Sequence, residues 1–221
     1  MSDPFVREGF LFAKQLIEKG ELGKITEAYF RLNHYRFDKE DLDPYYDKNK
    51  RQGGIMSDVG GHAIHMAHYL FGKPQSLNSV LTYNSSLAKE NDMEDSAIVT
   101  MVYEDDLRIT MSASFVTRAI QYEAIIYGDK GSIRIVPGER PGREKVFLYK
   151  SEREMTVYDS FQYKPKQHIL YFLDMLTKDI PNDEVGVDPL SNSGVGIDAA
   201  VEYVQIIDAI YKAAGKGLVK V

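Results

Sequence analysis

The chain has 221 residues, a formal net charge of −6 and no cysteine, and 43% of its residues are hydrophobic. This length and composition fit one domain with a sizeable core, which we assign to residues 1–221. The negative charge argues against nucleic acid as a partner, and the lack of cysteine excludes disulfides and thiolate zinc sites. Because the sequence shows neither a signal peptide nor an apolar run long enough to span a bilayer, we expect a cytoplasmic protein without membrane contact.

The first predicted elements are an amphipathic helix over Phe5–Lys19 and a strand over Ile25–Tyr35. An acidic loop that carries tyrosines follows over Asp38–Lys50. Tyr35 and Arg36 stand where the strand passes into this loop, and their side chains can donate hydrogen bonds to a polyol or an anionic group. The alternative is that they are ordinary solvated residues, as most loop residues are.

The stretch Gly53–Gly72 predicts a helix, because apolar residues recur at helical spacing and Gly72-Lys73-Pro74 is a stop signal. The predicted buried face consists of Ile55, Val59, Ala63, Met66 and Leu70. Asp58, His62 and His65 fall on a neighbouring stripe, since residues three, four and seven apart stack along one side of a helix. An acid and two imidazoles are therefore expected beside the core.

This stripe has the composition of a proton-transfer site. Asp58 lies in the predicted first turn, where unpaired N–H groups and the helix dipole favour a carboxylate. An anion one turn below His62 would orient the imidazole ring, which is a common arrangement for a general base. Gly53 and Gly54 would let a ligand approach the backbone closely.

Two other interpretations of the same stripe remain open. Asp58 can be a helix cap and His62 a satisfied, partly buried histidine. Alternatively, Asp58, His62 and His65 can form a metal site with a further ligand from elsewhere, although histidines three residues apart are weak evidence for one. We expect no metal, and we expect His68 to be a surface or packing residue.

The second half of the chain predicts a mostly antiparallel sheet built from successive hairpins. A strand over Ser76–Ser85 comes first, and three hairpins follow: Ser96–Tyr103 with Leu107–Phe115, Tyr122–Tyr127 with Ser132–Pro137, and Lys145–Lys150 with Glu154–Tyr158. Helices are predicted over Phe161–Lys178 and Gly194–Ala214, with a loop over Asn182–Ser193 between them. Helices before and after the strands would cover one face of the sheet.

Several strands are apolar on both sets of alternate residues, which is unusual for a sheet with one solvated face. Met101, Met111 and Tyr103 therefore suggest a second face that meets another protein surface. This pattern predicts a homo-oligomer formed through the sheet.

Arg118 and Tyr122 are further candidates for contact with a ligand, because they lie where a strand of the sheet is expected to turn. An arginine there can bind a carboxylate or a pair of hydroxyl groups. The alternative for Arg118 is an exposed surface residue, as most arginines are.

The pattern Gly53-Gly54-x-x-x-Asp58-x-Gly60-x-His62, followed by an apolar helix, resembles the catalytic helix of the Gfo/Idh/MocA oxidoreductases, a group that includes glucose–fructose oxidoreductase and inositol dehydrogenases. Further segments are similar to the same family and extend the likeness over nearly the whole chain: Phe12–Ile25, Glu94–Ala97, Tyr127–Ile133 and the end of the chain at Lys220-Val221.

The resemblance implies the second, C-terminal domain of such an enzyme: an α+β fold with an open, mainly antiparallel sheet and helices on one face. It implies that NAD or NADP is held mainly by an N-terminal Rossmann domain, and that a hydride passes between the cofactor and a sugar, polyol or related cyclic small-molecule substrate. His62 would take or return the hydroxyl proton, Asp58 would orient it, and Gly53 and Gly54 would lie near the cofactor. Dimers or tetramers through the open sheet face are also implied.

The sequence lacks the Gly-rich dinucleotide loop and the Glu-Lys-Pro motif of that family. We therefore expect the chain to be one half of a two-domain enzyme and to be inactive by itself. Two alternatives belong to other classes of protein. One is a non-catalytic ligand-binding or assembly module that kept the fold, and the other is a metal-binding protein that uses Asp58, His62 and His65.

Overall fold

The computed structural model describes residues 8–36, 53–118, 122–138, 144–161, 197–215 and 219–220. The predicted loops over 38–50 and 182–193 and the predicted helix over 161–178 lie outside these residues, apart from Phe161. No helix in the described part of the chain has the length and apolar character needed to cross a membrane.

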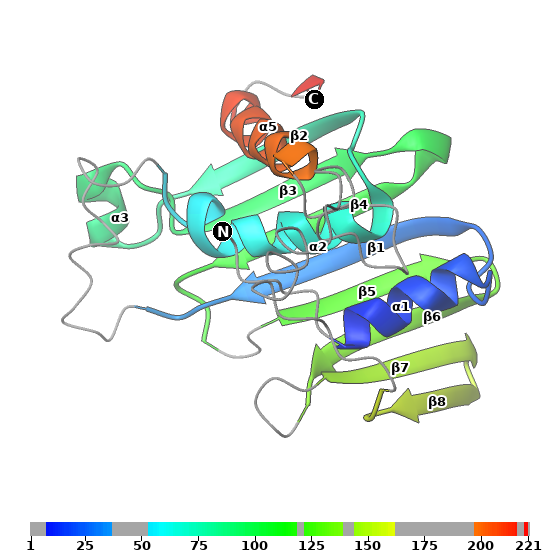
Figure 1. Ribbon diagram of the computed structural model, residues 1–221. Coiled ribbons are helices and arrows are strands. Elements are labelled where there is room, and N and C mark those ends of the chain that lie inside the picture. Colours follow the sequence, from blue (N-terminus) through cyan, green and yellow to red (C-terminus); the bar gives the residue numbers. More distant parts are fainter. Residues whose placement is uncertain are drawn as a thin grey trace, which may run out of the picture.

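A nine-stranded sheet dominates the described residues, and in Figure 1 three helices lie in front of it while a fourth, short helix lies beyond the strand ends at the left. The strands are β1 (Ile25–Asn33), β2 (Ser76–Thr82), β3 (Ser96–Val102), β4 (Arg108–Ser114), β5 (Tyr122–Gly128), β6 (Gly131–Pro137), β7 (Glu144–Ser151), β8 (Glu154–Tyr158) and β9 (Val219–Lys220). The helices are α1 (Glu8–Glu18), α2 (Gly61–Phe71), α3 (Ser86–Asn91) and α5 (Ile197–Ala213), with a π turn η1 (Met56–Gly60) and a 3₁₀ turn η2 (Glu104–Asp106).

The order of strands is β8-β7-β6-β5-β1-β4-β3-β2-β9, and every neighbouring pair is antiparallel except β1 with β4. The three predicted hairpins form as β3–β4, β5–β6 and β7–β8. In the first of them Asp105 and Asp106 have φ of +57° and +61°, a left-handed conformation that aspartate tolerates better than most residues. The expected α+β fold with an open, mainly antiparallel sheet is confirmed.

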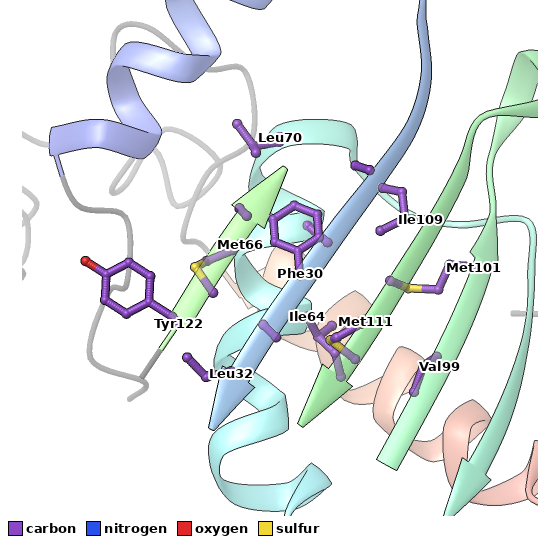
Figure 2. Close-up of a cluster of buried hydrophobic side chains, with 14 of the residues drawn as sticks. Phe30, Leu32, Ile64, Met66, Leu70, Val99, Met101, Ile109, Met111 and Tyr122 are labelled. Carbon is purple, nitrogen blue, oxygen red and sulfur yellow. The ribbon is translucent and has the colours of Figure 1, made fainter. Parts of the chain in front are cut away.

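The core fills the space between the sheet and the helices. Figure 2 shows Phe30 and Leu32 of β1 and Met111 of β4 among side chains of α2 that include Ile64 and Met66. All five are at most 3% exposed. The five residues predicted for the buried face of the 53–72 stretch are likewise buried, so the helical period was read correctly.

The residues named above as evidence for a second apolar face are placed differently by the structure. Met101, Met111 and Tyr103 are at most 5% exposed and belong to the core under the helices. In these strands both the odd-numbered and the even-numbered residues include apolar side chains. The alternation of apolar and polar residues therefore could not show which of the two sets faces the helices. The apolar side chains that do stand exposed on the opposite face are Tyr29, Val80, Ile98, Tyr127, Met155 and Val157.

Candidate functional site

The helix that carries Asp58 and His62 does not start as a regular α-helix. The Gly60 N–H donates to the Ile55 carbonyl at 2.8 Å, five residues back, so residues 56–60 form a π turn before α2 begins. In an α-helix, residue i+4 lies about 40° past residue i around the axis. A π turn holds more residues per turn, and it therefore brings His62 closer to the position directly above Asp58.

Asp58 is held by a cation from the end of strand β1. The Arg36 guanidinium donates to Asp58 Oδ2 at 3.1 Å, and both side chains are less than a fifth exposed. Arg36 is itself fixed, because its N–H donates to the Phe115 carbonyl and its guanidinium lies over the Phe115 ring. The guanidinium also lies 3.2 Å from His34 Nδ1. The sequence indicated Arg36 and Asp58 separately, and the structure joins them in one ion pair.

The two histidines that follow Asp58 on the helix, His62 and His65, are partly buried, and His65 lies next to helix α5. The rings of His65 and Tyr203 pack in an edge-to-face arrangement, with 6.3 Å between their centroids. A Cβ on Gly61 would collide with the Tyr203 hydroxyl, so the missing side chain makes room for this phenol. Burial, and then the Asp58 carboxylate, raise the pKa of Tyr203 to about 12. Tyr203 therefore stays a neutral hydrogen-bond donor near Asp58 at ordinary pH.

A buried glutamate holds the start of the same turn. Glu94, which is 2% exposed, accepts hydrogen bonds at 3.0 Å from the N–H groups of both Gly54 and Met56. The Tyr211 hydroxyl of α5 donates to the same carboxylate at 2.7 Å. Burial, and then the charge of Glu94, raise the pKa of Tyr211.

The two glycines predicted to lie near a cofactor are packed on one side against this network. A Cβ on Gly54 would overlap the carbonyl oxygen of Glu94, and one on Gly53 would overlap the Tyr211 hydroxyl. Gly53 also has a φ of +95°, which L side chains rarely adopt. Close packing is thus one reason for the glycine pair. Their predicted proximity to a cofactor stays a prediction.

The remaining predicted ligand contacts fall in two places. The Arg118 guanidinium carbon lies 3.8 Å from the centroid of the Tyr35 ring, and the guanidinium donates to the Tyr35 hydroxyl at 2.8 Å. These two residues form a pair at the surface, and Tyr35 directly precedes Arg36 in the sequence. Tyr122 lies in the core with 1% exposure, and its hydroxyl donates to Glu144 at 3.3 Å. A substrate could touch Tyr122 only after the chain around it moved.

The metal interpretation is not supported by the geometry. Among the residues that the structure describes, which include Asp58, His62 and His65, no three His, Asp or Glu side chains are grouped so as to hold a metal ion. The third histidine of the helix, His68, is buried and lies 2.8 Å from Glu202 of α5, as expected for a packing residue.

Sequence reasoning missed three residues of this neighbourhood. Tyr203 and Tyr211 lie on the helix predicted over Gly194–Ala214, and nothing in their spacing distinguishes them from its other residues. Glu94 left a signal, because the acidic pair Glu94-Asp95 directly precedes an apolar strand, where charged residues are uncommon.

The comparison of the sequence with known proteins gave one family. A family model described as the GFO/IDH/MocA C-terminal domain matches residues 10–134. "Uncharacterized oxidoreductase C115.03" of Schizosaccharomyces pombe is 26% identical over 128 residues, which are 56% of this chain and 34% of that protein. "Uncharacterized oxidoreductase YhhX" of Escherichia coli is 26% identical over 123 residues, which are 56% of this chain and 33% of that protein. The match thus spans about a third of these relatives' length.

The fold is similar to that of several solved oxidoreductases. An aldose–aldose oxidoreductase from Caulobacter crescentus, complexed with glycerol, has a TM-score of 0.75 at 19% identity, over 97% of this chain and 61% of that one. A levoglucosan dehydrogenase in complex with NADH and levoglucosan has a TM-score of 0.76 at 18% identity, over 99% of this chain and 64% of that one. At these identities the likeness shows the fold alone.

Proposed function

Because the chain belongs to the GFO/IDH/MocA C-terminal domain family, we propose that it is the substrate-binding half of an NAD(P)-dependent oxidoreductase. The substrate would be a sugar, a polyol or a related cyclic compound with a hydroxyl or carbonyl carbon. The oxidoreductase names of its relatives and the sugar named with levoglucosan dehydrogenase support this class. NAD or NADP would be held mainly by an N-terminal domain of the complete enzyme, and this chain would then be a single C-terminal domain.

The observation that carries the proposal is the Arg36–Asp58 ion pair at the foot of the helix that bears His62. Side chains that are less than a fifth exposed, yet not fully buried, can meet a ligand without much loss of hydration. An imidazole, a carboxylate, a guanidinium and a neutral phenol together can bind a hydroxyl group and accept its proton. No group in this set needs a metal for that task.

These four side chains can carry out the proton transfer, which is the part of the reaction that the nicotinamide does not perform. When bound, the nicotinamide supplies the hydride acceptor or donor. His62 accepts the proton of the substrate hydroxyl during oxidation and returns a proton to the carbonyl oxygen during reduction. Asp58, paired with Arg36, orients the substrate hydroxyl and the His62 ring relative to each other. Tyr203, which stays protonated, donates a hydrogen bond to the same region.

A homo-oligomer is the second part of the proposal. The sheet face opposite the helices carries Tyr29, Val80, Ile98, Tyr127, Met155 and Val157, each more than a third exposed. Apolar side chains gathered on one face of a sheet commonly mark a contact with another protein surface. A second copy of the chain would bury this face, in a dimer or as part of a tetramer.

The test of the chemistry is a substitution of His62 in the full-length protein. With a panel of sugars and polyols and either NAD or NADP, His62→Ala should lower kcat about 10²–10⁴-fold, the usual value of a general base. His68→Gln is the matched control, because His68 lies on the same helix but packs against Glu202. Unchanged kcat in His62→Ala would exclude the proton-transfer role. Binding of sugars with no turnover in the unmodified protein would instead favour a non-catalytic module.

A further inference from the structure

The first N–H groups of a helix normally need hydrogen-bond acceptors. The π turn η1 finds no such acceptor in the side chain of its own N-cap residue. The N-cap residue of the π turn is Ile55, whose side chain has no oxygen and makes no capping bond. Caps are usually Ser, Thr, Asp or Asn at that position. The donors at the start of this turn must therefore be satisfied from outside the helix.

Glu94 provides that partner from the other side of the sequence. Its two carboxylate oxygens accept from the N–H groups of Gly54 and Met56, and its backbone carbonyl accepts from Ile55 at 2.9 Å. Three consecutive residues are thus held by one glutamate that lies about 40 positions away in the chain. The hydroxyl of Tyr211 adds a further donor to the carboxylate, which a buried charge requires.

The glutamate itself is attached to the sheet. The next residue, Asp95, donates its N–H to the Thr82 carbonyl at the end of β2, and its carbonyl accepts from Phe115 just after β4. Phe115 is also the residue whose carbonyl and ring hold Arg36. The same short region of the sheet therefore fixes both members of the Arg36–Asp58 pair, one through Phe115 and the other through Glu94 and the π turn.

We propose that Glu94, with Tyr211 as its donor, is a positioning residue that sets the place of Asp58 and His62 by holding the π turn against the sheet. This inference rests on the function proposed above, and it adds two residues that do not touch the substrate. Its physical basis is that proton transfer is sensitive to displacements of about 1 Å, which can cost roughly 100-fold in rate.

The test is Glu94→Gln in the full-length protein. The glutamine oxygen can accept only one of the two N–H groups, and its NH₂ group then faces the other, so one end of the turn is released. We expect kcat to fall about 10–100-fold with little change in KM, since misplaced groups lose rate before they lose binding. The pH profile of kcat should shift as well. Tyr211→Phe, which leaves both backbone bonds in place, should lower kcat by a smaller factor.

Glu144→Gln is the matched control, because Glu144 is an equally buried carboxylate that accepts from the Gly9 N–H and from a tyrosine hydroxyl. It should lower the resistance to urea as Glu94→Gln does, but leave kcat and the pH profile unchanged. Equal kinetic effects of the two variants would overturn the inference, since loss of stability alone would then explain both.

A readout without turnover separates this inference from the proposed function. In NMR spectra of the full-length protein, Glu94→Gln should move the His62 ring resonances and their titration midpoint, whereas Glu144→Gln should not. If no substrate is found for the unmodified protein but the His62 signals move, the positioning role stands and the oxidoreductase assignment fails. Unmoved His62 signals in Glu94→Gln would refute the positioning role.

Discussion

At the scale of single residues, the main feature of the candidate site is the position of its charged side chains and the identity of their partners. Arg36 and Asp58 come from a strand end and a helix start, and they meet at 3.1 Å. A partly buried ion pair costs desolvation, so its presence here is weak evidence that it stabilises the fold. Glu94, by contrast, is a fully buried carboxylate of the same region, and its partners in the bonds described above are all neutral donors.

The ion pair can be measured by a double-mutant cycle of Arg36→Met and Asp58→Asn. Each single variant leaves one partner without its opposite charge, so each should lower the free energy of unfolding by about 1–3 kcal/mol. The double variant should cost less than the sum of the two, with a coupling energy of about 0.5–3 kcal/mol. Urea unfolding at neutral pH is the measurement. Strict additivity of the two changes would show that the pair contributes nothing to the folded state.

At the scale of elements, the π turn and its glycines determine how closely the helix start approaches the sheet. Gly54 lies against backbone atoms of Glu94, which cannot move aside, whereas Gly60 lies against the flexible side chain of Met56. Both glycines belong to the same short segment, so the two positions form a natural comparison.

Gly54→Ala should therefore destabilise the protein far more than Gly60→Ala. The first should cost about 3 kcal/mol or more, because a backbone atom must shift to admit the new methyl group. The second should cost about 1 kcal/mol or less, since Met56 can change rotamer and alanine favours a helical conformation. Thermal or urea unfolding of both variants measures the difference. A Gly54→Ala protein as stable as Gly60→Ala would mean that the contact with Glu94 is not tight.

Local sequence patterns were sufficient for most elements in the described residues. Turn residues between apolar runs predicted the three hairpins, and the helical period predicted which side of the 53–72 stretch is buried. Helix α3 was missed, since six residues give too short a pattern for a helical period to show. Its N-cap is Ser85, whose hydroxyl accepts from the Ala88 N–H, but a serine before a short polar run is not distinctive.

The candidate site could be predicted only in part, because its residues depend on contacts between distant segments. Asp58 and His62 share one helix, so their spacing was readable. The pairing of Arg36 with Asp58 and the role of Glu94 depend on how strands order in the sheet, which local patterns do not encode. The π turn is likewise a tertiary effect, since the buried glutamate that stabilises it lies in another segment.

At the scale of the whole molecule, the sheet has one face under helices and one face that carries exposed apolar residues. The residues that the sequence analysis named for the second face, Met101, Met111 and Tyr103, lie in the core, whereas other apolar side chains are exposed on that face. The sequence did not show which alternate residues of a strand face the helices. Ile98 and Val99 of β3, for example, are neighbours and both apolar, but only Ile98 is exposed. The oligomer itself stays a prediction.

Tyr127→Asp tests that prediction directly. Tyr127 is 38% exposed on the open face and packs edge-on against Tyr29, so a carboxylate there would have to be buried in any contact through this face. Sedimentation velocity should show an oligomer for the unmodified protein and smaller species for the variant. Val204→Asp is the control, because Val204 is 61% exposed but lies on α5, on the helical side. Monomers at high concentration for the unmodified protein would contradict the proposed assembly.

The placement of β1 also governs the order in which the molecule can assemble. Although β1 comes first among the strands, its two neighbours β4 and β5 are made only much later in the chain. During synthesis β1 must wait without partners until about 80 further residues have emerged, while β3 can pair with β2 as soon as it appears. We therefore expect the pairing of β1 with β4 and β5 to be the slow, non-local step of folding, and we expect the same step to place Arg36 beside Phe115 and Asp58.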